Sequence, residues 1–538
     1  MQGNGTLNMR GWPSALLGWG VLLLLMPPAE AATTYYMSPG GSTAATCGSL
    51  ANPCKLFSVA IPKLNPGDTL VLLDGTYDST TSGYPNIDCA SGARNGTAAA
   101  PITVKAEHER RAWLKGTGAQ TPFRMNQCSY WTIEGIRGSS ADHPNDGHPT
   151  GSVMWVKDSS HIILRRLLLH ENNRYFNTHL LGLQDTTRSG ISGHHLVEES
   201  EFYSFHRHAI LNRHTANDVY RRNYFNSRAH ADLPGCVSGP PWTPYCSGAP
   251  SRGEMGISVY PGSHNILENN VSEGNHGMAD IQAINTSDHN RWMGNVSLYD
   301  IHGYIIKTRG DCDPPTFPND PKCKPNDNTV EHSISVGNNA SGFYARSTTN
   351  TLCRNCSFLN GVNNGALADE EAVNTSSPNT VFLENSLALN NATYGFRITE
   401  QANWGLDYVN AFGNGTNFFP PATDPHITNE RSQDPLLGAC RVFIPEGSTM
   451  KGAGKGGADI GATILYAYQD GTLTTTPLWV TTKPTGYTGP SYPRYFRGCG
   501  VVLPGVNDDP ATSCVGVANR LNVGMNGCTL PPGYDVTL

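Results

Sequence analysis

The feature that most limits the fold of this 538-residue chain is a short repeat between about residues 120 and 420. Each copy starts at a glycine, continues through a strand-like run and a polar turn, and ends with a second run near an asparagine. The clearest copies start at Gly256, Gly277, Gly303, Gly342, Gly365 and Gly395, with spacings of 21, 26, 39, 23 and 30 residues. Repeats of roughly 20–30 residues are typical of solenoids, in which each copy buries its apolar face against the next.

Composition and run length indicate the kind of solenoid. The runs are too short for helices, and 58 Gly and 37 Pro with only 15% charged residues argue against helical repeats and coiled coils. A hydrophobic content of 38% argues against a disordered chain, and a net charge of −7 gives no reason to expect nucleic acid as a partner. We therefore predict an all-β fold, a parallel β-helix, with a pair of β-sandwiches or a propeller as the alternatives.

The first 31 residues have the pattern of a secretory signal peptide. Arg10 precedes an apolar run over residues 15–26, and Ala29-Glu-Ala31 has the small-residue pattern of a cleavage site. This run is shorter than the roughly 20 residues needed to span a membrane, and no later segment is long enough. We therefore expect no transmembrane segment and a secreted chain, located extracellularly, in a periplasm or at the cell surface.

The cysteines agree with an oxidising compartment. The chain has 14 of them, and several form close pairs, namely Cys47/Cys54, Cys236/Cys246, Cys312/Cys323 and Cys353/Cys356. An even number in an exported chain predicts disulfides. Zinc is the alternative for the Cys353-Arg-Asn-Cys356 motif, but that motif has no matching second CxxC or histidine pair.

Two segments resemble a known superfamily. The first contains Tyr35-Tyr-Met-Ser-Pro-Gly-Gly41, Lys63-Leu-Asn-Pro-Gly-Asp-Thr-Leu-Val71 and Pro101-Ile-Thr-Val-Lys-Ala106, and the second is Gly457-Ala-Asp-Ile-Gly-Ala462. They resemble the N-terminal and closing segments of exported right-handed β-helix proteins of the pectate-lyase-like superfamily. The resemblance implies a right-handed parallel β-helix with an N-terminal cap over residues 32–462, and leaves 463–538 as an irregular C-terminal extension. It does not specify an activity, because that superfamily holds lyases, hydrolases, epimerases and adhesins.

A row of charged residues is the main candidate for an active site. Successive side chains of a strand point to opposite faces, so the fourth residue after each glycine is expected to point outward. In consecutive copies these positions are Lys307, Arg346, Asp369 and Thr399, with Arg309 and Glu400 close by and Asp280 one copy upstream. Equivalent residues of neighbouring layers lie about 4.8 Å apart, so these side chains would line a continuous groove.

These residue types suit the β-elimination that cleaves a uronic-acid polymer. Lys307 is our candidate for the base that removes the C5 proton, because the neighbouring Arg309 and Arg346 would favour its neutral amine. Either arginine could hold the substrate carboxylate. The alternative is a structural ion-pair ladder that pairs Arg346 with Asp369 and Lys307 with Asp280.

The carboxylates of the row have other uses. Asp280, Asp369 and Glu370 could bind Ca²⁺, which prefers oxygen ligands, and Asp369 and Glu400 could contact the substrate. A glycoside hydrolase would need two carboxyl groups roughly 5–9.5 Å apart, which Asp369 could form with Asp280 or Glu400.

Other candidates for substrate binding lie outside the row. Eight histidines fall within residues 161–214, where Arg213 and His214 could form the cationic end of a groove. Solvated turns are the alternative for this segment. Tyr260, and Trp242 from an insertion, are candidates for contacts to sugar rings.

We therefore predict an exported, monomeric β-helix that acts on an acidic polysaccharide or another glycan, with a lyase favoured and Ca²⁺ as the candidate cofactor. A non-catalytic glycan-binding or adhesin-type surface protein is the second hypothesis. A glycoside hydrolase or epimerase on the same scaffold is the third. Only a lyase would release an unsaturated sugar that absorbs in the ultraviolet.

Overall fold

The structure is a computed structural model that describes residues 31–117, 121–140, 152–170, 179–203, 205, 207–227, 255–283, 287–308, 325–369, 380–399, 403–479, 521, 528–531 and 534. For residues 279–283 and 308 it describes the backbone alone. Nearly all of the predicted signal peptide lies outside these ranges. Within them, no helix has the length and apolar character needed to cross a membrane.

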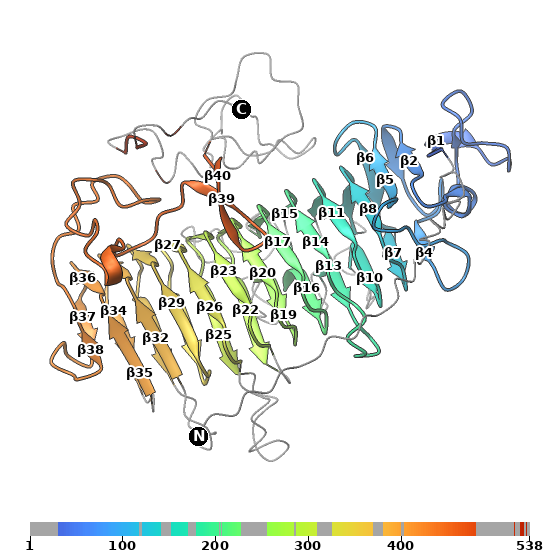
Figure 1. Cartoon of the computed structure of the whole chain (residues 1–538). Helices are drawn as coiled ribbons and strands as arrows, with labels where there is room; N and C mark the ends of the chain where they lie inside the picture. The colour runs from blue at the N-terminus through green and yellow to red at the C-terminus, as the bar shows by residue number, and fades with distance from the viewer. Residues whose placement is uncertain are drawn as a thin grey trace, which may run out of the picture.

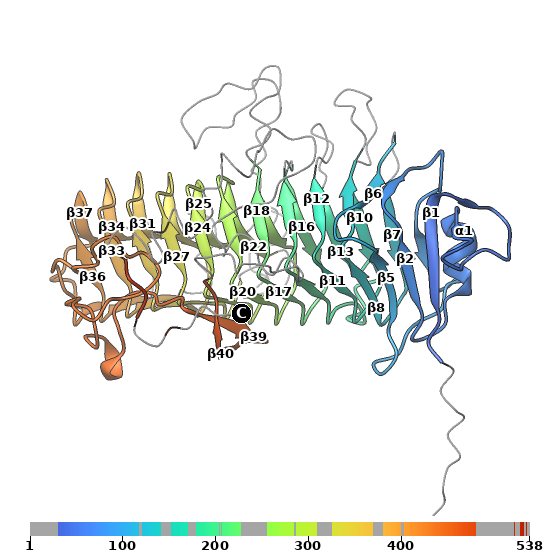
Figure 2. The same cartoon turned by 90° about the horizontal axis from the view of Figure 1, so that it is seen from above.

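Three long parallel sheets run the length of the molecule and form the sides of a β-helix (Figures 1 and 2). Sheet 1 has 14 strands in the order β1 (Thr34–Ser42), β2 (Thr69–Leu72), β5 (Ile102–Ala106), β8 (Trp131–Glu134), β11 (Ile163–Arg165), β14 (Leu196–Glu198), β17 (Val219–Arg221), β20 (Ile266–Glu268), β23 (Arg291–Met293), β26 (Thr329–Glu331), β29 (Thr351–Arg354), β32 (Thr380–Glu384), β35 (Asn403–Asp407) and β38 (Ile427–Thr428). Sheet 2 has 12 strands in the order β4 (Asn86–Asp88), β7 (Phe123–Asn126), β10 (Met154–Lys157), β13 (His179–Gln184), β16 (His208–Arg213), β19 (Met255–Val259), β22 (Gly277–Ala283), β25 (His302–Thr308), β28 (Ser341–Arg346), β31 (Asn364–Asp369), β34 (Tyr394–Ile398) and β37 (Thr416–Phe419). Sheet 3 has 12 strands in the order β3 (Gly75–Tyr77), β6 (Ala112–Lys115), β9 (Arg137–Ser139), β12 (Leu168–His170), β15 (Glu201–Tyr203), β18 (Tyr224–Asn226), β21 (Val271–Glu273), β24 (Val296–Leu298), β27 (Ile334–Val336), β30 (Ser357–Leu359), β33 (Leu387–Leu389) and β36 (Asn410–Phe412).

Each turn of the coil adds one strand to sheet 2, one to sheet 1 and one to sheet 3, as β10, β11 and β12 do. The prediction of a right-handed parallel β-helix is confirmed, and the sandwich and propeller alternatives are wrong. The remaining elements of the described residues are α1 (Phe57–Ala60) and the 3₁₀ turn η1 (Ile61–Lys63) at the N-terminal end, the 3₁₀ turn η5 (Lys455–Gly457), and the hairpin β39 (Tyr466–Gln469) and β40 (Thr472–Pro477).

Glycines recur at the start of the sheet 2 strands because adjacent turns leave no room for a side chain. A Cβ on Gly342 would lie 2.7 Å from the carbonyl oxygen of Gly365, and a Cβ on Gly365 would lie 2.6 Å from that of Gly395. Gly277 departs from this pattern, because its partner in the next turn is His302. The repeat therefore slips by one residue at β22.

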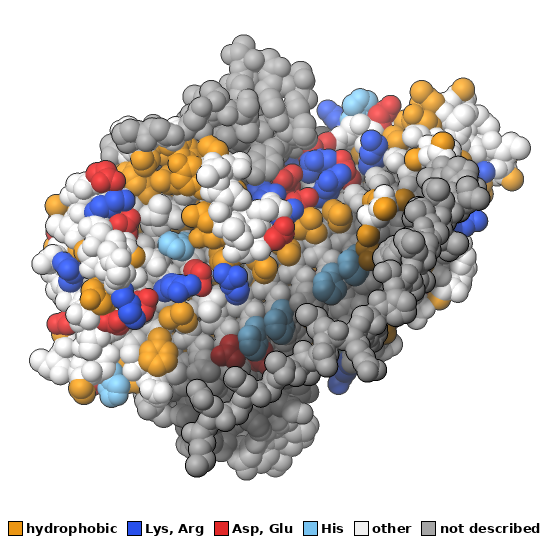
Figure 3. Space-filling view, viewed as in Figure 1, with side chains coloured by type: hydrophobic (Ala, Val, Ile, Leu, Met, Phe, Trp, Pro, Cys, Tyr) orange, Lys and Arg blue, Asp and Glu red, His pale blue; other side chains and the backbone are white. Residues whose placement is uncertain are grey.

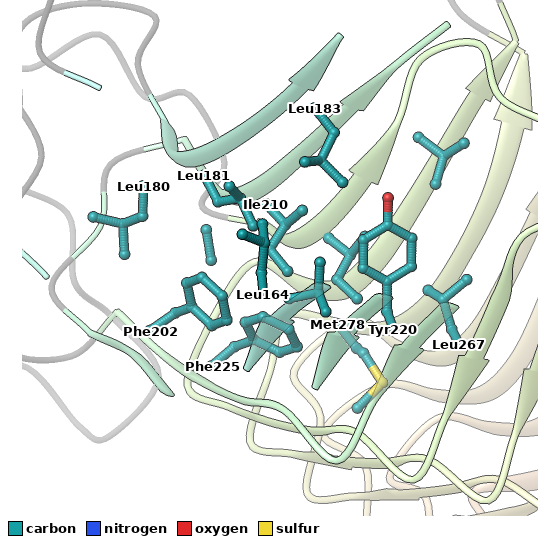
Figure 4. Close-up of a cluster of buried hydrophobic side chains, with 14 of the residues drawn as sticks. Leu164, Leu180, Leu181, Leu183, Phe202, Ile210, Tyr220, Phe225, Leu267 and Met278 are labelled. Atoms are coloured by element: carbon teal, nitrogen blue, oxygen red, sulfur yellow. The ribbon is translucent and has the colours of Figure 1, made fainter. Parts of the chain in front are cut away.

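The inside of the coil is filled by apolar side chains from all three sheets (Figure 4). Leu164 of sheet 1, Ile210 of sheet 2 and Phe202 of sheet 3 are each 0% exposed. Phe202 and Phe225 of successive turns stack with ring centroids 5.2 Å apart. This burial is the main stabilising contribution to the fold, and it decides which face of each sheet points outward.

Buried asparagines connect successive turns. The backbone N–H of Asn223 donates to the side-chain oxygen of Asn270 at 3.0 Å, and the N–H of Asn270 donates to that of Asn295 at 2.8 Å. All three residues are 0% exposed. Their side chains satisfy backbone groups that burial would otherwise leave without a partner, which explains the asparagine near the end of each repeat.

Charged side chains of both signs gather along the outer face of sheet 1 (Figure 3). Glu134, Arg165, Glu198, Arg221 and Glu268 are register partners in successive turns. An Arg165 nitrogen lies 2.6 Å from Glu134, and Arg221 Nε lies 2.8 Å from Glu198. A structural ion-pair ladder therefore exists on sheet 1, and the Arg346–Asp369 pair of the alternative considered for the sheet 2 row is also formed.

The chain beyond β38 packs on the outside of sheet 3. There it forms a second apolar cluster that joins residues of sheet 3 to residues of the C-terminal segment, including Val271, Val296, Leu298 and Ile334 from the sheet and Val442, Ile444, Ile464 and Trp479 from the segment. A disulfide between Cys440 and Cys528 ties the last described residues to this cluster. The C-terminal segment thus covers an apolar face that would otherwise be exposed to solvent.

The described cysteines correct part of the disulfide prediction. Cys47–Cys54 is bonded as expected, and Cys89–Cys128 forms a further disulfide near the N-terminal end. Cys353 and Cys356 are free and buried, with their sulfur atoms 2.7 Å apart. Both thiols lie in the apolar core of the coil. The expected pairs Cys236/Cys246 and Cys312/Cys323 lie outside the described residues.

Candidate functional site

The predicted row of charged residues lies on sheet 2. Gln282, Lys307, Arg346 and Asp369 are register partners in β22, β25, β28 and β31. The residues that alternate with this row, Tyr304, Ile306, Phe343 and Ala345, are 0% exposed and belong to the core. The row therefore points away from the core, because successive side chains of a strand alternate between the two faces.

Arg346 and Asp369 form an ion pair within this row. Arg346 Nε lies 3.7 Å from Asp369 Oδ1, and the two side chains are 34% and 29% exposed. The hydroxyl of Tyr344, on the same face of β28, lies 3.5 Å from Asp369 Oδ2. Burial, reinforced by the nearby Asp369 carboxylate, raises the pKa of Tyr344 above its ordinary value. A guanidinium and a protonated phenol therefore lie next to each other.

Two imidazoles beside Lys307 were not predicted as site residues. His276 and His302 have ring centroids 5.7 Å apart, and His302 stacks on Tyr344 at 5.1 Å. Burial, followed by the charge of Lys307, lowers the pKa of His276 to about 4. Burial, followed by His276 and Lys307, lowers the pKa of His302 to about 3. Both rings are therefore neutral at neutral pH. The recurrence of His-Gly at 276–277 and 302–303 was the sequence signal for them.

The row continues upstream toward the N-terminal end of sheet 2. Lys157, Gln184 and Arg213 are register partners, and the pairing of β16, β19, β22 and β25 brings them into line with Lys307. Lys157 Nζ lies 4.2 Å from the centre of the Trp155 ring, a cation–π contact. This part of the face thus carries two further cations and an indole.

The three residues predicted to bind substrate at the upstream end, Arg213, His214 and Tyr260, differ in exposure and in charge. Arg213 is exposed at the end of β16, whereas burial and the charges of Arg188 and Arg213 lower the pKa of His214 to about 4. His214 is therefore neutral at neutral pH and adds no positive charge. Tyr260 is only 7% exposed, with its ring against His208 at 5.6 Å. Tyr260 is thus packed under the surface in this conformation.

Of the three carboxylates predicted to bind Ca²⁺, the structure describes the side chain of Asp369 alone. Asp280 pairs with Ile305, in a different row from Lys307, and lies three turns away from Asp369. Three turns correspond to roughly 14 Å along the coil, too far for both carboxylates to bind one ion or to act as a hydrolase pair. The described chain does hold a cluster of Asp74, Glu107 and His108, whose ligand atoms lie within 4.8 Å of one another. Its imidazole does not fit the all-oxygen preference of Ca²⁺, so no catalytic step is assigned to calcium.

Four predicted site residues cannot be placed: Arg309, Glu370, Glu400 and Trp242 lie outside the described residues. The side chain of Asp280 is likewise outside the description, although its register is given by β22. The candidate site of the described chain therefore consists of Lys307, Arg346, Asp369 and Tyr344, with the two imidazoles beside them.

The fold and this face define a class of protein: a parallel β-helix with cationic and aromatic side chains along the outside of one sheet. No family model and no curated protein matches the sequence. Solved structures similar to the chain include pectate lyase Pel9A, at 14% identity and a TM-score of 0.41 over 81% of this chain and 96% of that one. A PL6 family polysaccharide lyase from Pseudopedobacter saltans is similar at 12% identity and a TM-score of 0.41, over 70% of this chain and 91% of that one. The GH87 alpha-1,3-glucanase of Streptomyces thermodiastaticus is similar at 12% identity and a TM-score of 0.43, over 70% of this chain and 64% of that one. These similarities concern the fold, which the three parallel sheets establish independently.

Proposed function

We propose that the protein is an exported enzyme that binds an acidic polysaccharide on the outer face of sheet 2 and cleaves it by β-elimination. The observation that carries this proposal is the pairing of Lys307 with Arg346 in adjacent turns of an outward row. An amine and a guanidinium at this spacing can act on a single uronate unit, one on its proton and the other on its carboxylate.

Each group has a defined role in the proposed reaction. The guanidinium of Arg346 binds the carboxylate and stabilises the negative charge that develops on it when the C5 proton leaves. The amine of Lys307 is the base that takes that proton. The C5–H electron pair then forms the C4–C5 double bond as the C4–O bond breaks. The hydroxyl of Tyr344, kept protonated by its raised pKa, donates a proton to the departing oxygen.

The neutral imidazoles support this arrangement. Because His276 and His302 stay uncharged at neutral pH, they do not repel the cations of the row. Together with Tyr344 they form an aromatic surface beside Lys307 on which a sugar ring can pack. Lys157 and Arg213 provide positive charge for further uronate units along the same row.

The test is the formation of unsaturated product from uronate polymers, such as polygalacturonate and alginate, followed by ultraviolet absorbance. We expect activity in the wild type and a loss of about 100-fold or more in kcat for Lys307→Ala, the usual cost of removing a catalytic base. Lys455→Ala is the matched control, because this lysine pairs with Glu384 on sheet 1, away from the row. It should retain wild-type kcat.

Two outcomes would contradict the proposal. If no uronate polymer yields the absorbance, the lyase activity is wrong, and binding without cleavage would instead favour a non-catalytic glycan-binding β-helix. If a polymer is cleaved and Lys307→Ala retains full activity, the assignment of the base is wrong. Reducing ends formed without absorbance would indicate hydrolysis.

A further inference from the structure

A second outward row of sheet 2 leads from the candidate site to the C-terminal end of the coil. Its members are register partners in β28, β31, β34 and β37, namely Tyr344, Leu367, Arg397 and Phe419. The residue before each of them lies in the apolar core, so the row itself points outward. Figure 1 shows β34 and β37 at the C-terminal end of the coil. The row therefore connects Tyr344 with the end of the sheet.

Three side chains meet at the end of this row. The guanidinium carbon of Arg397 lies 5.3 Å from the centre of the Tyr394 ring, which is a cation–π contact. The rings of Tyr394 and Phe419 have centroids 5.8 Å apart, and Phe419 is 45% exposed. We call Tyr394, Arg397 and Phe419 the terminal cluster. It presents an aromatic ring to solvent beside a cation.

Arg397 differs from Arg346 and from the arginines of the sheet 1 ladder in its partners. Arg346 lies 3.7 Å from Asp369, and Arg165 and Arg221 are paired with glutamates. Within the described part of the chain, no carboxylate pairs with Arg397, and its Nε has no hydrogen-bond partner. A guanidinium has five N–H donors and binds a carboxylate through two of them. The contacts of Arg397 are therefore those of a cation that lacks its anion.

We propose that the terminal cluster is a distal subsite that binds one uronate unit of an acidic polysaccharide. Arg397 binds the carboxylate of this unit, and the exposed Phe419 ring packs against its sugar ring. The subsite lies three turns from Lys307, since β25, β28, β31 and β34 are successive strands of the sheet. Three turns correspond to roughly 14 Å along the coil. A polymer with one unit at Lys307 thus passes over the half-buried Leu367 before it reaches the cluster.

This inference rests on the proposed function for the class of polymer, but binding at the terminal cluster requires no cleavage. Binding and cleavage can therefore be tested separately. A structural role is the competing explanation, because β37 is the last strand of sheet 2 and its aromatic ring could simply cover the edge of the sheet. Such a role would affect stability and not the affinity for an oligosaccharide.

The test measures by calorimetry how octasaccharides and disaccharides prepared from polygalacturonate and alginate bind. The background is Lys307→Ala, which lacks the proposed base and so leaves the ligands intact. Arg397→Gln and Phe419→Ala are the test variants in this background. Their matched controls are Arg291→Gln and Phe382→Ala, which remove partly exposed side chains of the same types from sheet 1, 42% and 39% exposed.

We expect Arg397→Gln to weaken binding of the acidic octasaccharide about tenfold, because a hydrogen bond to a charged group is lost. Phe419→Ala should weaken it about fivefold, through the loss of ring packing. Neither change should alter the affinity for the disaccharide, which is too short to extend from Lys307 to the cluster. Both controls should bind the octasaccharide within about twofold of the background protein.

Several results would overturn the distal subsite. Equal octasaccharide affinities for Arg397→Gln and Arg291→Gln would do so, and so would an equal loss for the disaccharide and the octasaccharide. A lower unfolding midpoint of Phe419→Ala with unchanged affinities would assign the cluster to covering the sheet edge. Arg397-dependent binding of the octasaccharide, with no unsaturated product from the wild type, would support the subsite and contradict the lyase activity.

Discussion

Several histidines of this chain are held uncharged by burial. The pKa is lowered to about 3 for His179, His195 and His302 and to about 4 for His276, and burial is the largest cause in each case. Buried carboxylic acids behave in the opposite sense. Burial raises the pKa of Asp218 to about 7, and it also raises the pKa of Glu199, Glu268 and Asp288. At the scale of single residues, the fold therefore selects neutral forms inside and beside the coil.

These shifts predict a loss of stability in mild acid. An unfolded imidazole takes up a proton below a pH of about 6.5, whereas the four folded ones do not until pH 3–4, so lowering the pH favours the unfolded chain. Each group should cost about 2 kcal/mol between pH 6.5 and 5. Protonation of the carboxyl groups with raised pKa values works in the opposite direction, but these are four groups against the seven described histidines whose pKa is lowered. Urea unfolding midpoints at pH 7 and 5 measure the effect, and a midpoint that stays constant or rises in acid would contradict it.

At the scale of elements, each sheet 2 strand and the turn that connects it to the preceding sheet 3 strand have almost the same structure in successive turns of the coil. Gly342 is the clearest case, because a Cβ there would meet the Gly365 carbonyl oxygen and a Phe358 ring carbon, each at 2.7 Å. A side chain at this position would force two turns of the coil apart. The spacing of the row that holds Lys307 and Arg346 depends on this close contact.

We therefore expect Gly342→Ala to lower the unfolding midpoint, by about 1–3 kcal/mol of unfolding free energy, as overpacking usually does. Gly40→Ala is the matched control, because a Cβ at Gly40 meets no atom within 4 Å. Urea unfolding followed by circular dichroism compares the two variants. Equal unfolding midpoints for the two variants would show that the turns around Gly342 can move apart without a loss of unfolding free energy.

Much of the arrangement of the strands could be predicted from the sequence. The spacing of the glycines predicted the turns of the coil, and the alternation of side chains along each strand predicted the outward row of Lys307, Arg346 and Asp369. Alternation could not identify His276 and His302 as neighbours of Lys307, because they lie at strand starts whose side-chain direction depends on how the corner packs. It also did not reveal the one-residue slip at Gly277, which places Asp280 opposite Ile305.

At the scale of the whole molecule, the C-terminal segment is fastened to the coil by a buried carboxylate. Glu268 is 0% exposed and accepts hydrogen bonds from the backbone N–H groups of Asp470 at 3.0 Å and Gly471 at 2.9 Å. Arg221 adds an ion pair to Asp470 at 2.9 Å. These contacts hold the hairpin of β39 and β40 against sheet 1, while the segment before it covers sheet 3.

Replacing Glu268 by Gln should loosen this hairpin. The amide keeps one acceptor oxygen and turns an N–H₂ group toward a backbone N–H, which leaves buried donors without a partner at a cost of about 1–3 kcal/mol. We expect faster amide hydrogen exchange in residues 466–477 and earlier proteolytic cleavage there. Glu384→Gln is the control, because Glu384 lies in the same sheet but pairs with the exposed Lys455. Unchanged exchange in the hairpin would mean that the apolar cluster alone holds it.

The sequence by itself determined the coil, because the repeat of glycine, short strand and asparagine can be satisfied only by stacking turns that bury one side of each strand. It also determined which residues of sheet 2 point outward, since alternation is a local property of the chain. Tertiary structure alone decided which outward faces stay exposed. Sheet 1 pairs its charges in a ladder, and Asp470 of the C-terminal segment joins that ladder through Arg221, 249 residues earlier in the chain. The same segment covers sheet 3 with apolar residues, whereas the row of Lys307, Arg346 and Asp369 on sheet 2 stays partly exposed. Contacts between residues so far apart in the sequence form only once the coil has folded and its outer faces exist. Local sequence patterns therefore carry no information about them.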